Sequence, residues 1–305
     1  MHMNRIYRSA DELLSLEAAI LRENLPLDRD GDRLYSLISF IRSHARRPTE
    51  NPVFNDVLFH LNTSDEILNP LRVFVTDKEH GKQFIKSVLG DELNVPTLAV
   101  LRNPAEVAAF RFPERCVIKP THASSEVIVR LAGEAIDRTR LESWFRLNYY
   151  QKTREANYRY LQPKIIVEPI LFDNPKLSDI KVFCFEGRAK LLFVDIHLDG
   201  QHFRKFYDMD WNPLKFSLRY PNPDHLVVPR PMNLAAMLEA AEQLSRQFSL
   251  VRIDLYSDGQ RFYVGEITNC SGAGLAKFDS YASELSASRM IFGSAGVTRQ
   301  GPVSL

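Results

Sequence analysis

The chain has 305 residues, of which 45% are apolar and 25% are charged, and its formal net charge is +1 at pH 7. This length predicts a large core divided into two or three lobes, while the balanced charge disfavours nucleic acid or an anionic membrane as a partner. Cys116, Cys184 and Cys270 form no CxxC pair, which argues against a disulfide framework or a zinc site. No apolar run reaches the length of a membrane span and no signal-peptide pattern is present, so we expect a soluble cytoplasmic protein.

Residues 1–76 are predicted to be mostly helical. Ser9 suits the N-cap of a helix over residues 10–23, with Glu12 completing a capping box. A second helix is expected over residues 33–46. Its basic end is predicted to be solvated and consists of Arg42, His44, Arg46 and Arg47.

A strand-rich region is expected after this helical segment. A capped helix starts at Thr76 or Asp77, and a strand over residues 115–120 ends in Lys119. A polar loop of small residues then leads into a paired strand. A strand, a small-residue loop and a second strand, with a lysine at the end of the first strand, is the pattern of a flap that covers phosphate.

The second half of the chain predicts further strands. A buried strand over residues 165–167 meets Glu168 at a hinge stiffened by Pro169. Two strands follow around a Glu-Gly turn, and Lys181 lies inside the first of them among apolar residues. Because lysine is rarely buried without a partner, Lys181 is expected to have an anionic one. Helices are predicted over residues 137–150, 233–248 and 282–290.

Residues 250–274 predict two strands around a Ser-Asp-Gly turn. Arg252 and Asp254 share one face, and Glu266 lies on the second strand. A regular two-residue turn would place the two carboxylates on opposite faces. A shared Mg2+ therefore requires an odd-membered loop or a bulge, for which Gly259 or Gly265 is the candidate. The alternative is a surface hairpin with solvated charges.

The sequence contains no GxxxxGKS or GxxxxGKT loop, so a P-loop is excluded. The Gly-Ala-Gly at residues 272–274 does not complete a dinucleotide fingerprint either. Instead, cations on the strand-rich region precede a carboxylate at the hinge and an acidic pair on the last strands. In chain order the series is Lys78, Lys119, Glu168, Lys181, Arg252, Asp254 and Glu266.

This order resembles the ATP-grasp superfamily, in which two α+β lobes close on ATP. The matching motifs are DK at 77–78, VIKP at 117–120, VEPI at 167–170, RID at 252–254 and GEITN at 265–269. Within the superfamily, the chain is most similar to the TupA-like ATP-grasp family of polysaccharide-biosynthesis loci. The stretches that carry this similarity are NPVFNDVLFHL, DIKVFCFEG, FRKFYDMDWN, VRIDLY and GEIT, and the resemblance covers residues 48–275.

The resemblance implies an α+β fold with ATP and Mg2+ as cofactors. The implied organisation is a helical N-terminal segment over residues 1–76, an ATP-grasp N-terminal lobe with the phosphate flap over 77–167, and a C-terminal lobe with the metal site over 168–305. The oligomeric state does not follow from the resemblance.

The resemblance also implies how the nucleotide is held. Lys119 and Lys181 would contact the ATP phosphates, with Lys78 as a more peripheral contact. Glu168 and the backbone at Ile170 would hold the adenine or ribose at the hinge.

Asp254 and Glu266 are the metal ligands that the resemblance implies. Asn269 is expected to assist, although the superfamily usually has its Asn two residues after the Glu, where this chain has Thr268. The flap lacks the glycines that the family usually has. The hydroxyls that could replace the missing backbone contacts to phosphate are those of Ser124 and Ser125.

The implied reaction is phosphoryl transfer followed by amide formation. A substrate carboxylate attacks the γ-phosphate to give an acyl phosphate while Lys181 neutralises charge, and an amine then displaces phosphate. Arg252 would stabilise the tetrahedral oxyanion, and backbone N–H groups at residues 271–274 could hold the acyl phosphate. We therefore expect an ATP-dependent carboxylate–amine ligase that attaches an amino acid or peptide to a glycan or small metabolite.

Two alternatives use the same residues differently. One is a kinase that phosphorylates a sugar hydroxyl, for which a base would be needed from among Asp195, His197, Asp208 and Asp210. The other is a non-catalytic nucleotide-binding module, which the glycine-poor flap suggests.

Overall fold

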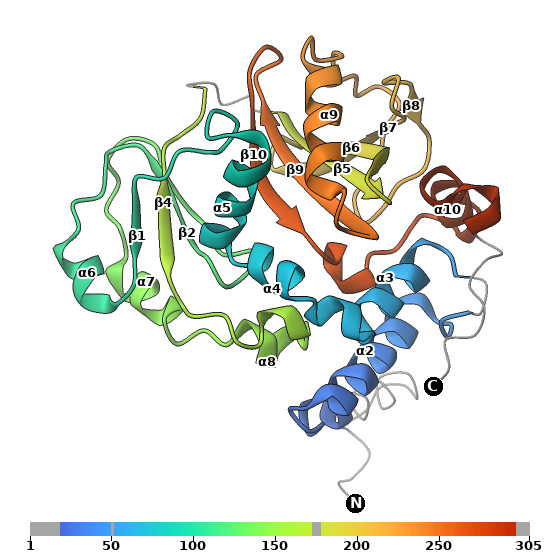
Figure 1. The fold of residues 1–305 in the computed structure, drawn as a ribbon, viewed down its shortest axis with the longest axis horizontal. Helices are drawn as coiled ribbons and strands as arrows, with labels where there is room; N and C mark the ends of the chain where they lie inside the picture. The colour runs from blue at the N-terminus through green and yellow to red at the C-terminus, as the bar shows by residue number, and fades with distance from the viewer. Residues whose placement is uncertain (1–18, 50–51, 173–177, 297–305) are drawn as a thin grey trace, which may run out of the picture.

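The computed structural model describes residues 19–49, 52–172 and 178–296. Over these residues it has two antiparallel sheets with helices around them (Figure 1). The α-helices are α2 (Arg29–His44), α3 (Phe54–Thr63), α4 (Pro70–Thr76), α5 (Lys78–Leu89), α6 (Pro104–Ala109), α7 (Arg138–Trp144), α8 (Tyr149–Thr153), α9 (Leu234–Ser245) and α10 (Tyr281–Gly296). Short 3-10 helices are η1 (Asp65–Leu68), η2 (Ala156–Tyr158) and η3 (Ser271–Gly274).

The strands alternate with these helices along the chain. They are β1 (Ala99–Leu101), β2 (Cys116–Pro120), β3 (Ile128–Arg130), β4 (Ile165–Glu168), β5 (Ser178–Phe185), β6 (Arg188–Leu198), β7 (Gln201–Tyr207), β8 (Pro213–Leu214), β9 (Leu250–Ser257) and β10 (Phe262–Thr268). No helix in the described ranges is both long enough and apolar enough to cross a bilayer.

Helix α2 begins earlier than the prediction of residues 33–46. The side chain of Asp28 caps it by accepting a hydrogen bond from the backbone N–H of Gly31 at 2.8 Å. Ala45 then adopts a φ of 53°, which ends the helix in the left-handed region. The predicted cap at Ser9 lies outside the described residues.

The smaller sheet has the strand order β1-β4-β2-β3. Helices α6 and α7 cover one of its faces, where Val107, Leu141 and Trp144 pack against β2 and β4. The predicted strand, loop and paired strand are therefore present as β2 and β3. Because side chains alternate along a strand, Lys119 and Glu168 lie on the opposite face.

The single helix predicted over residues 137–150 is two helices, α7 and α8. The side chain of Asn148 accepts a hydrogen bond from the backbone N–H of Gln151 at 2.9 Å and so caps α8. An Asn cap inside the segment ends one helix and starts the next, which the apolar spacing alone did not reveal.

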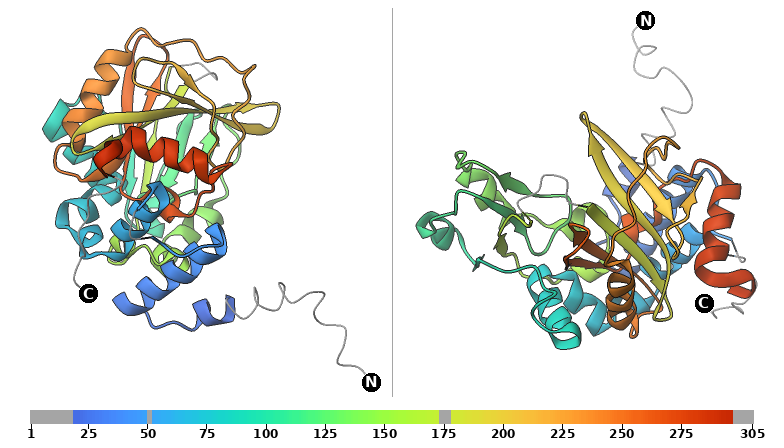
Figure 2. Two further views of the ribbon diagram at one scale, coloured as in Figure 1. Left: turned by 90° about the vertical axis from the view of Figure 1, so that its right-hand side faces the viewer. Right: turned by 90° about the horizontal axis from the view of Figure 1, so that it is seen from above.

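The larger sheet has the strand order β10-β9-β5-β6-β7-β8. Helix α9 packs on one face (Figure 1), where its apolar side chains meet those of β5, β6 and β9. Helices α3 and α10 pack on the other face (Figure 2), where Phe54 and Ala287 join a core with Phe183 and Phe193. They cover only part of that face. The rest of it carries charged side chains and forms the candidate site.

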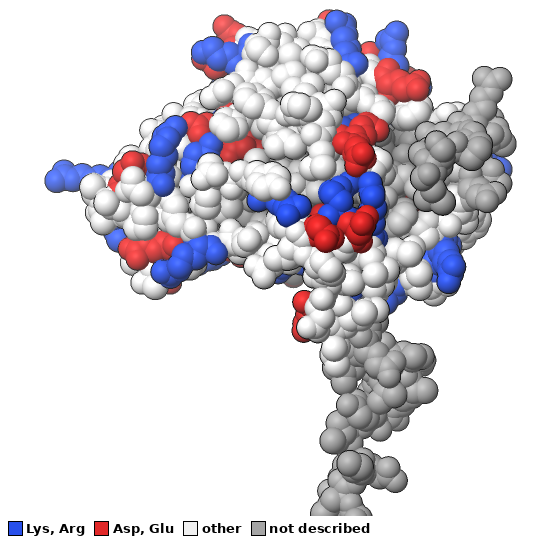
Figure 3. Space-filling model, turned by 60° about the horizontal axis from the view of Figure 1, so that its bottom comes forward, with Lys and Arg blue, Asp and Glu red and all other residues white. Residues whose placement is uncertain are grey.

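Charged side chains on the outer surface are mixed in sign. On the face drawn in Figure 3, the described acidic and basic side chains are interspersed and separated by wide uncharged areas. This agrees with the small net charge of the sequence. The cations that matter for the site are instead gathered between the two sheets.

Candidate nucleotide and metal site

Strands β9 and β10 form a hairpin that contains a β-bulge. Leu255 pairs with Val264, whereas Asp254 pairs with Glu266, so Gly265 is an extra residue in β10. The bulge returns Glu266 to the face of Asp254, and the two carboxylates lie opposite each other across the strands. The bulge at Gly265 that a shared metal would require is thereby confirmed.

The side chain of Tyr256 explains why the bulge residue is glycine. A Cβ at position 265 would lie 2.4 Å from Cε2 of the Tyr256 ring, which is closer than carbon atoms can approach. Gly265 is therefore required for close packing, and its φ is not in the left-handed region.

Arg252 is held rigidly beside Asp254. Its Nε and Nη2 donate to the two carboxylate oxygens at 2.6 and 2.7 Å, and further hydrogen bonds reach Thr268 at 3.1 Å and Ser271 at 2.8 Å. Burial opposes the charge of Arg252, but Asp254 raises the guanidinium pKa above its ordinary value. Bidentate pairing of this kind fixes both side chains in place.

Lys181 lies among three carboxylates, as its position inside a strand predicted. Its Nζ pairs with Asp179 and lies 3.4 Å from Asp195 and 3.9 Å from Asp254. Burial opposes its charge, but these three carboxylates together raise the pKa of Lys181 above its usual value. Lys181 therefore remains a cation beside the acidic pair.

Glu266 is surrounded by positive charge from both sheets. Burial opposes ionisation, but Lys78, Arg252, Lys119 and Lys181 together hold the pKa of Glu266 below its usual value. Lys119 lies on β2 of the smaller sheet, Lys78 lies at the start of α5 and is bonded to the flap, and the other two lie on the larger sheet. The structure thus brings together the predicted cations and the predicted carboxylates.

Glu168 joins two lysines at the end of β4. Its oxygens lie 2.7 Å from Nζ of Lys119 and 2.7 Å from Nζ of Lys82. Burial raises the pKa of Glu168, but the two lysines outweigh this effect and leave it below its usual value. Glu168 therefore orients Lys119.

The start of α5 is tied to the flap. Nζ of Lys78 donates to the carbonyl of Ala123 at 2.7 Å, and Asp77, which caps α5, accepts from the Thr121 hydroxyl at 2.7 Å. Ser125 has a φ of 66°, a conformation that glycine adopts more easily. The glycine-poor flap therefore still makes the turn that glycines would favour.

A family model for TupA-like ATP-grasp proteins matches residues 61–287, which is more than half of the chain. The chain belongs to the TupA-like ATP-grasp family. The α+β architecture of two antiparallel sheets is accordingly the ATP-grasp fold.

Solved structures show more distant likenesses to this TupA-like chain. They include the ATP-grasp ligase PsnB with its minimal precursor (12% identity, TM-score 0.38, 66% of this chain and 54% of that one). The D-alanine-D-alanine ligase from Helicobacter pylori is also similar, with 15% identity and a TM-score of 0.38 over 72% of this chain and 62% of that one. The D-alanine-D-alanine ligase from Bacillus anthracis has 16% identity and a TM-score of 0.41 over 70% of this chain and 66% of that one. The chain thus spans 54% to 66% of the length of these neighbours. These TM-scores are too low to transfer residue roles. A search of curated protein sequences gives no match.

Asn269 is placed differently from its predicted role as a metal ligand. Its amide nitrogen donates to the carbonyl of Arg72 and to the hydroxyl of Thr76, both at 2.9 Å, and its amide oxygen accepts from Arg72 at 3.1 Å. Thr268, two residues after Glu266, instead faces Arg252. Strand alternation turns Asn269 away from the carboxylates, so we leave it out of the proposed metal site.

A cavity of about 320 Å³ lies beside the hinge after β4. Ile170 lines it, together with Phe172 and Tyr263, whose ring centroids are 5.4 Å apart. A larger cavity of about 600 Å³ lies between Arg22 and Arg154 and contains none of the predicted site residues. The smaller cavity is the better candidate for a planar base because aromatic rings border it and the hinge residues Pro169 and Ile170 line it.

A second group of possible metal ligands consists of Asp77, Glu79 and His80. Nζ of Lys164 lies 3.1 Å from Asp77 and also pairs with Glu79. The oxygens of Asp77 also accept from the Thr121 hydroxyl and from the backbone N–H groups of Glu79 and His80, so this group serves to fix the start of α5.

Sequence reasoning missed Lys82 and Asp179, and it named Asp195 only as a candidate base and not as a partner of Lys181. Lys82 follows Lys78 by one helical turn, and this spacing could have revealed it. Asp179 precedes Lys181 by two residues on β5, so strand alternation could have revealed it. Asp195 reaches Lys181 from β6 and could be assigned only after the strand register was known.

The basic cluster after α2 is not simply a solvated helix end. Arg46 Nη1 lies 2.6 Å from the buried Asp56, and Nη2 lies 3.4 Å from Glu284 of α10. The ring of His44 contacts the carbonyl of Gly274 at 2.8 Å, and burial lowers its pKa. The prediction was wrong for these two residues because their partners come from distant parts of the chain.

Proposed function

We propose that this protein is an ATP-dependent, ADP-forming ligase that joins a carboxylate to an amine. The observation that carries the proposal is the opposed pair Asp254 and Glu266, faced by cations from both sheets. Membership of the ATP-grasp family supports ATP as the nucleotide. We further propose that an amino acid or peptide is attached to a glycan or small metabolite.

Asp254 and Glu266 suit Mg2+ because they offer the carboxylate oxygens that a hard cation prefers. When bound there, Mg2+ would neutralise phosphate oxygens of ATP. Lys181 and Lys119 would hold the same phosphates from opposite sides. Lys78, one turn from Lys82, would place its charge near the flap, where the hydroxyls of Ser124 and Ser125 could contact phosphate.

The residues of the chain would then act on charge that develops during the reaction. The substrate carboxylate would attack the γ-phosphate, and Lys181 would offset the negative charge of that group. Arg252 would stabilise the oxyanion formed when the amine attacks the acyl phosphate. Its fixed contacts to Asp254 and Ser271 mean that it would need little reorganisation.

The kinase alternative has less support from side-chain positions. Asp195 forms a bidentate pair with Arg204 at 2.8 and 3.1 Å. Burial alone would raise the pKa of Asp195, but its contacts, of which that with Arg204 is the strongest, lower this pKa to about 2. Asp208 accepts hydrogen bonds within its own turn. A base needs a free carboxylate near the acceptor, which neither residue offers.

Product analysis tests the proposed reaction. Purified protein is incubated with ATP, Mg2+ and mixtures of amino acids and small carboxylates. We expect ADP and phosphate to appear only when both a carboxylate and an amine are present. Release of AMP, or transfer of phosphate to a hydroxyl, would contradict the proposal.

Replacing the acidic pair tests the site itself. Glu266→Gln should lower turnover by about 10²-fold or more, roughly 2.7 kcal/mol of barrier, because one metal ligand loses its charge. Glu114→Gln is the matched control, since Glu114 is exposed and lies away from the site. Steady-state rates at saturating ATP decide the test, and equal rates in the two variants would exclude Glu266 from the reaction.

A further inference from the structure

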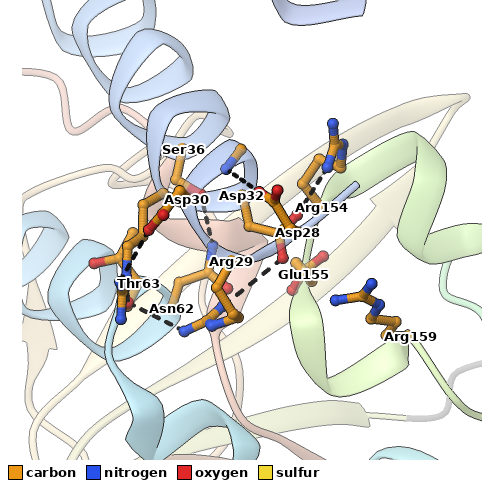
Figure 4. Close-up of polar contacts among 12 residues, drawn as sticks. Asp28, Arg29, Asp30, Asp32, Ser36, Asn62, Thr63, Arg154, Glu155 and Arg159 are labelled. Atoms are coloured by element: carbon orange, nitrogen blue, oxygen red, sulfur yellow. Dashed lines mark hydrogen bonds and ion pairs between the residues drawn. The ribbon is translucent and has the colours of Figure 1, made fainter. Parts of the chain in front are cut away.

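Glu155 is a buried carboxylate whose side chain has no partner in the part of the chain that the structure describes. Only 8% of the residue is exposed. In the described ranges its side chain forms neither an ion pair nor a hydrogen bond. In Figure 4, Arg154 and Arg29 both reach Asp32, whereas no drawn contact reaches Glu155. Burying a charge without compensation is costly, so such a residue calls for a function.

The segment that carries Glu155 is fixed beside the end of β10. Asn157 donates to the hydroxyl of Thr76 at 2.9 Å, and Asn269 donates to the same hydroxyl at 2.9 Å. Asn269 follows Glu266 by three residues. Thr76 therefore links the start of η2 to the end of the strand that carries the proposed metal ligand.

The neighbours of Glu155 place its carboxylate on the side of the candidate site. Burial raises the pKa of Tyr149, Tyr158 and Cys270, and the charge of Glu155 raises each of them further. The charge of Glu266 also raises the pKa of the two tyrosines. Their ring centroids are 4.6 Å apart. The tyrosine pair therefore lies within electrostatic reach of both carboxylates.

The other cations packed near η2 have partners of their own. Arg159, which follows η2, donates to the carbonyl of Leu27 at 2.7 Å. Arg72 of α4 binds Glu66 of η1 and also contacts the carbonyl of Leu250 at 3.1 Å. Arg252 approaches Tyr158 but is bound to Asp254. No cation of the described chain neutralises Glu155, and burial raises its pKa to about 8.

We propose that Glu155 binds the ammonium group of the amine substrate and accepts its proton. The inference rests on the proposed ligase function. It follows from a buried carboxylate that has no side-chain partner among the described residues and lies within electrostatic reach of the same two tyrosines as Glu266. Carboxylate and aromatic faces together favour a small cation.

The proton transfer fits the balance of the reaction. The Glu155 carboxylate takes one proton from the ammonium group, which leaves a neutral amine. The nitrogen lone pair forms the bond to the carbonyl carbon of the acyl phosphate, and the bond from that carbon to the phosphate oxygen breaks. Phosphate leaves with the electron pair and takes the second proton of the nitrogen.

Binding of ethylammonium tests the site without requiring turnover. The thermal midpoint of the protein is followed against ethylammonium, with potassium chloride at equal ionic strength as the reference. Stabilisation should grow as the pH rises through the pKa of Glu155, because ethylammonium stays charged while Glu155 ionises. Glu155→Gln should weaken the apparent affinity by about tenfold or more, whereas Glu114→Gln should not.

Two results would overturn the site. One is the absence of any ethylammonium-specific stabilisation of the wild-type protein both below and above the pKa of Glu155. The other is equal stabilisation of wild type and Glu155→Gln. The pH dependence of the wild type decides the test even when the variant fails to fold.

A kinetic experiment separates this proposal from the ligase function. With an amine that supports ADP release, Glu155→Gln should raise KM for that amine about tenfold. Hydroxylamine, which is uncharged at neutral pH, should still trap the acyl phosphate at near wild-type rates. An unchanged KM for the amine in Glu155→Gln would contradict the ammonium site but not the ligase function. Ethylammonium binding without ADP release under any condition contradicts the ligase function alone.

Discussion

Glu155 should affect the stability of the fold as well as its chemistry. Its pKa of about 8 in the folded protein exceeds the ordinary value of about 4.3 for an unfolded chain. Both states bind the proton below the lower value, and between the two values the unfolded state alone ionises. Stability is therefore lost as the pH rises from about 4 to 8.

We expect Glu155→Gln to remove this loss. The variant should gain stability relative to wild type as the pH rises, by about 1.4 kcal/mol per unit of pKa difference and a few kcal/mol in total. Urea unfolding of both proteins at several pH values measures the difference. A constant difference across this range would contradict the assignment.

At the scale of single elements, the β9–β10 hairpin depends on one contact. Gly265→Ala places a methyl group against the ring of Tyr256, and we expect a cost of about 1–3 kcal/mol from overpacking. Tyr256→Leu in the same chain should recover part of this cost. Unfolding free energies of the two single variants and the double variant give the coupling.

Gly200→Ala is the control for the hairpin. Gly200 has a φ of 74° with no atom within 4 Å of the added Cβ, so its variant reports backbone strain alone, about 1 kcal/mol. Tyr256→Leu should give no recovery there. If the unfolding free-energy changes of Gly265→Ala and Tyr256→Leu simply add in the double variant, the contact between position 265 and the Tyr256 ring does not define the bulge.

Helices α3 and α10 are connected through Arg46. Arg46→Ala leaves the fully buried side chain of Asp56 without its cation, and we expect a loss of about 3 kcal/mol. Arg47→Ala, at the adjacent exposed position, should change stability by less than about 0.5 kcal/mol. Chemical denaturation of both variants tests this contrast, and equal effects would mean that the Arg46 pair contributes little.

At the scale of the whole molecule, the two sheets have separate apolar cores but share the charges around Glu266. ATP with Mg2+ should therefore restrain both parts together. We expect slower amide hydrogen exchange in β2 and the flap as well as in β9 and β10. Glu266→Gln should weaken this protection on both sides. Protection confined to one sheet would contradict a site built between them.

Much of the site was visible in the sequence because its residues recur at positions fixed by strand periodicity. Arg252 and Asp254 share a face in any extended strand, and the need for an odd-membered loop or a bulge at Gly259 or Gly265 followed from counting residues. Lys181 required an anionic partner on physical grounds alone. Helix boundaries were less well predicted at α2 and α7 because local caps at Asp28 and Asn148 overrode the apolar pattern.

The sequence by itself determined the ATP-grasp family, the order of cations and carboxylates, and the shared face of Arg252 and Asp254. The bulge at Gly265, seen only in the structure, decided that Glu266 joins that face. Only the tertiary structure decided which residues meet: Lys82 with Glu168, Arg46 with Asp56, and Asn269 with Arg72. It also left Glu155 buried with no side-chain partner among the described residues. Periodicity within an element is set by local backbone geometry, whereas pairing between elements depends on how distant segments pack, and no spacing along the chain encodes that packing.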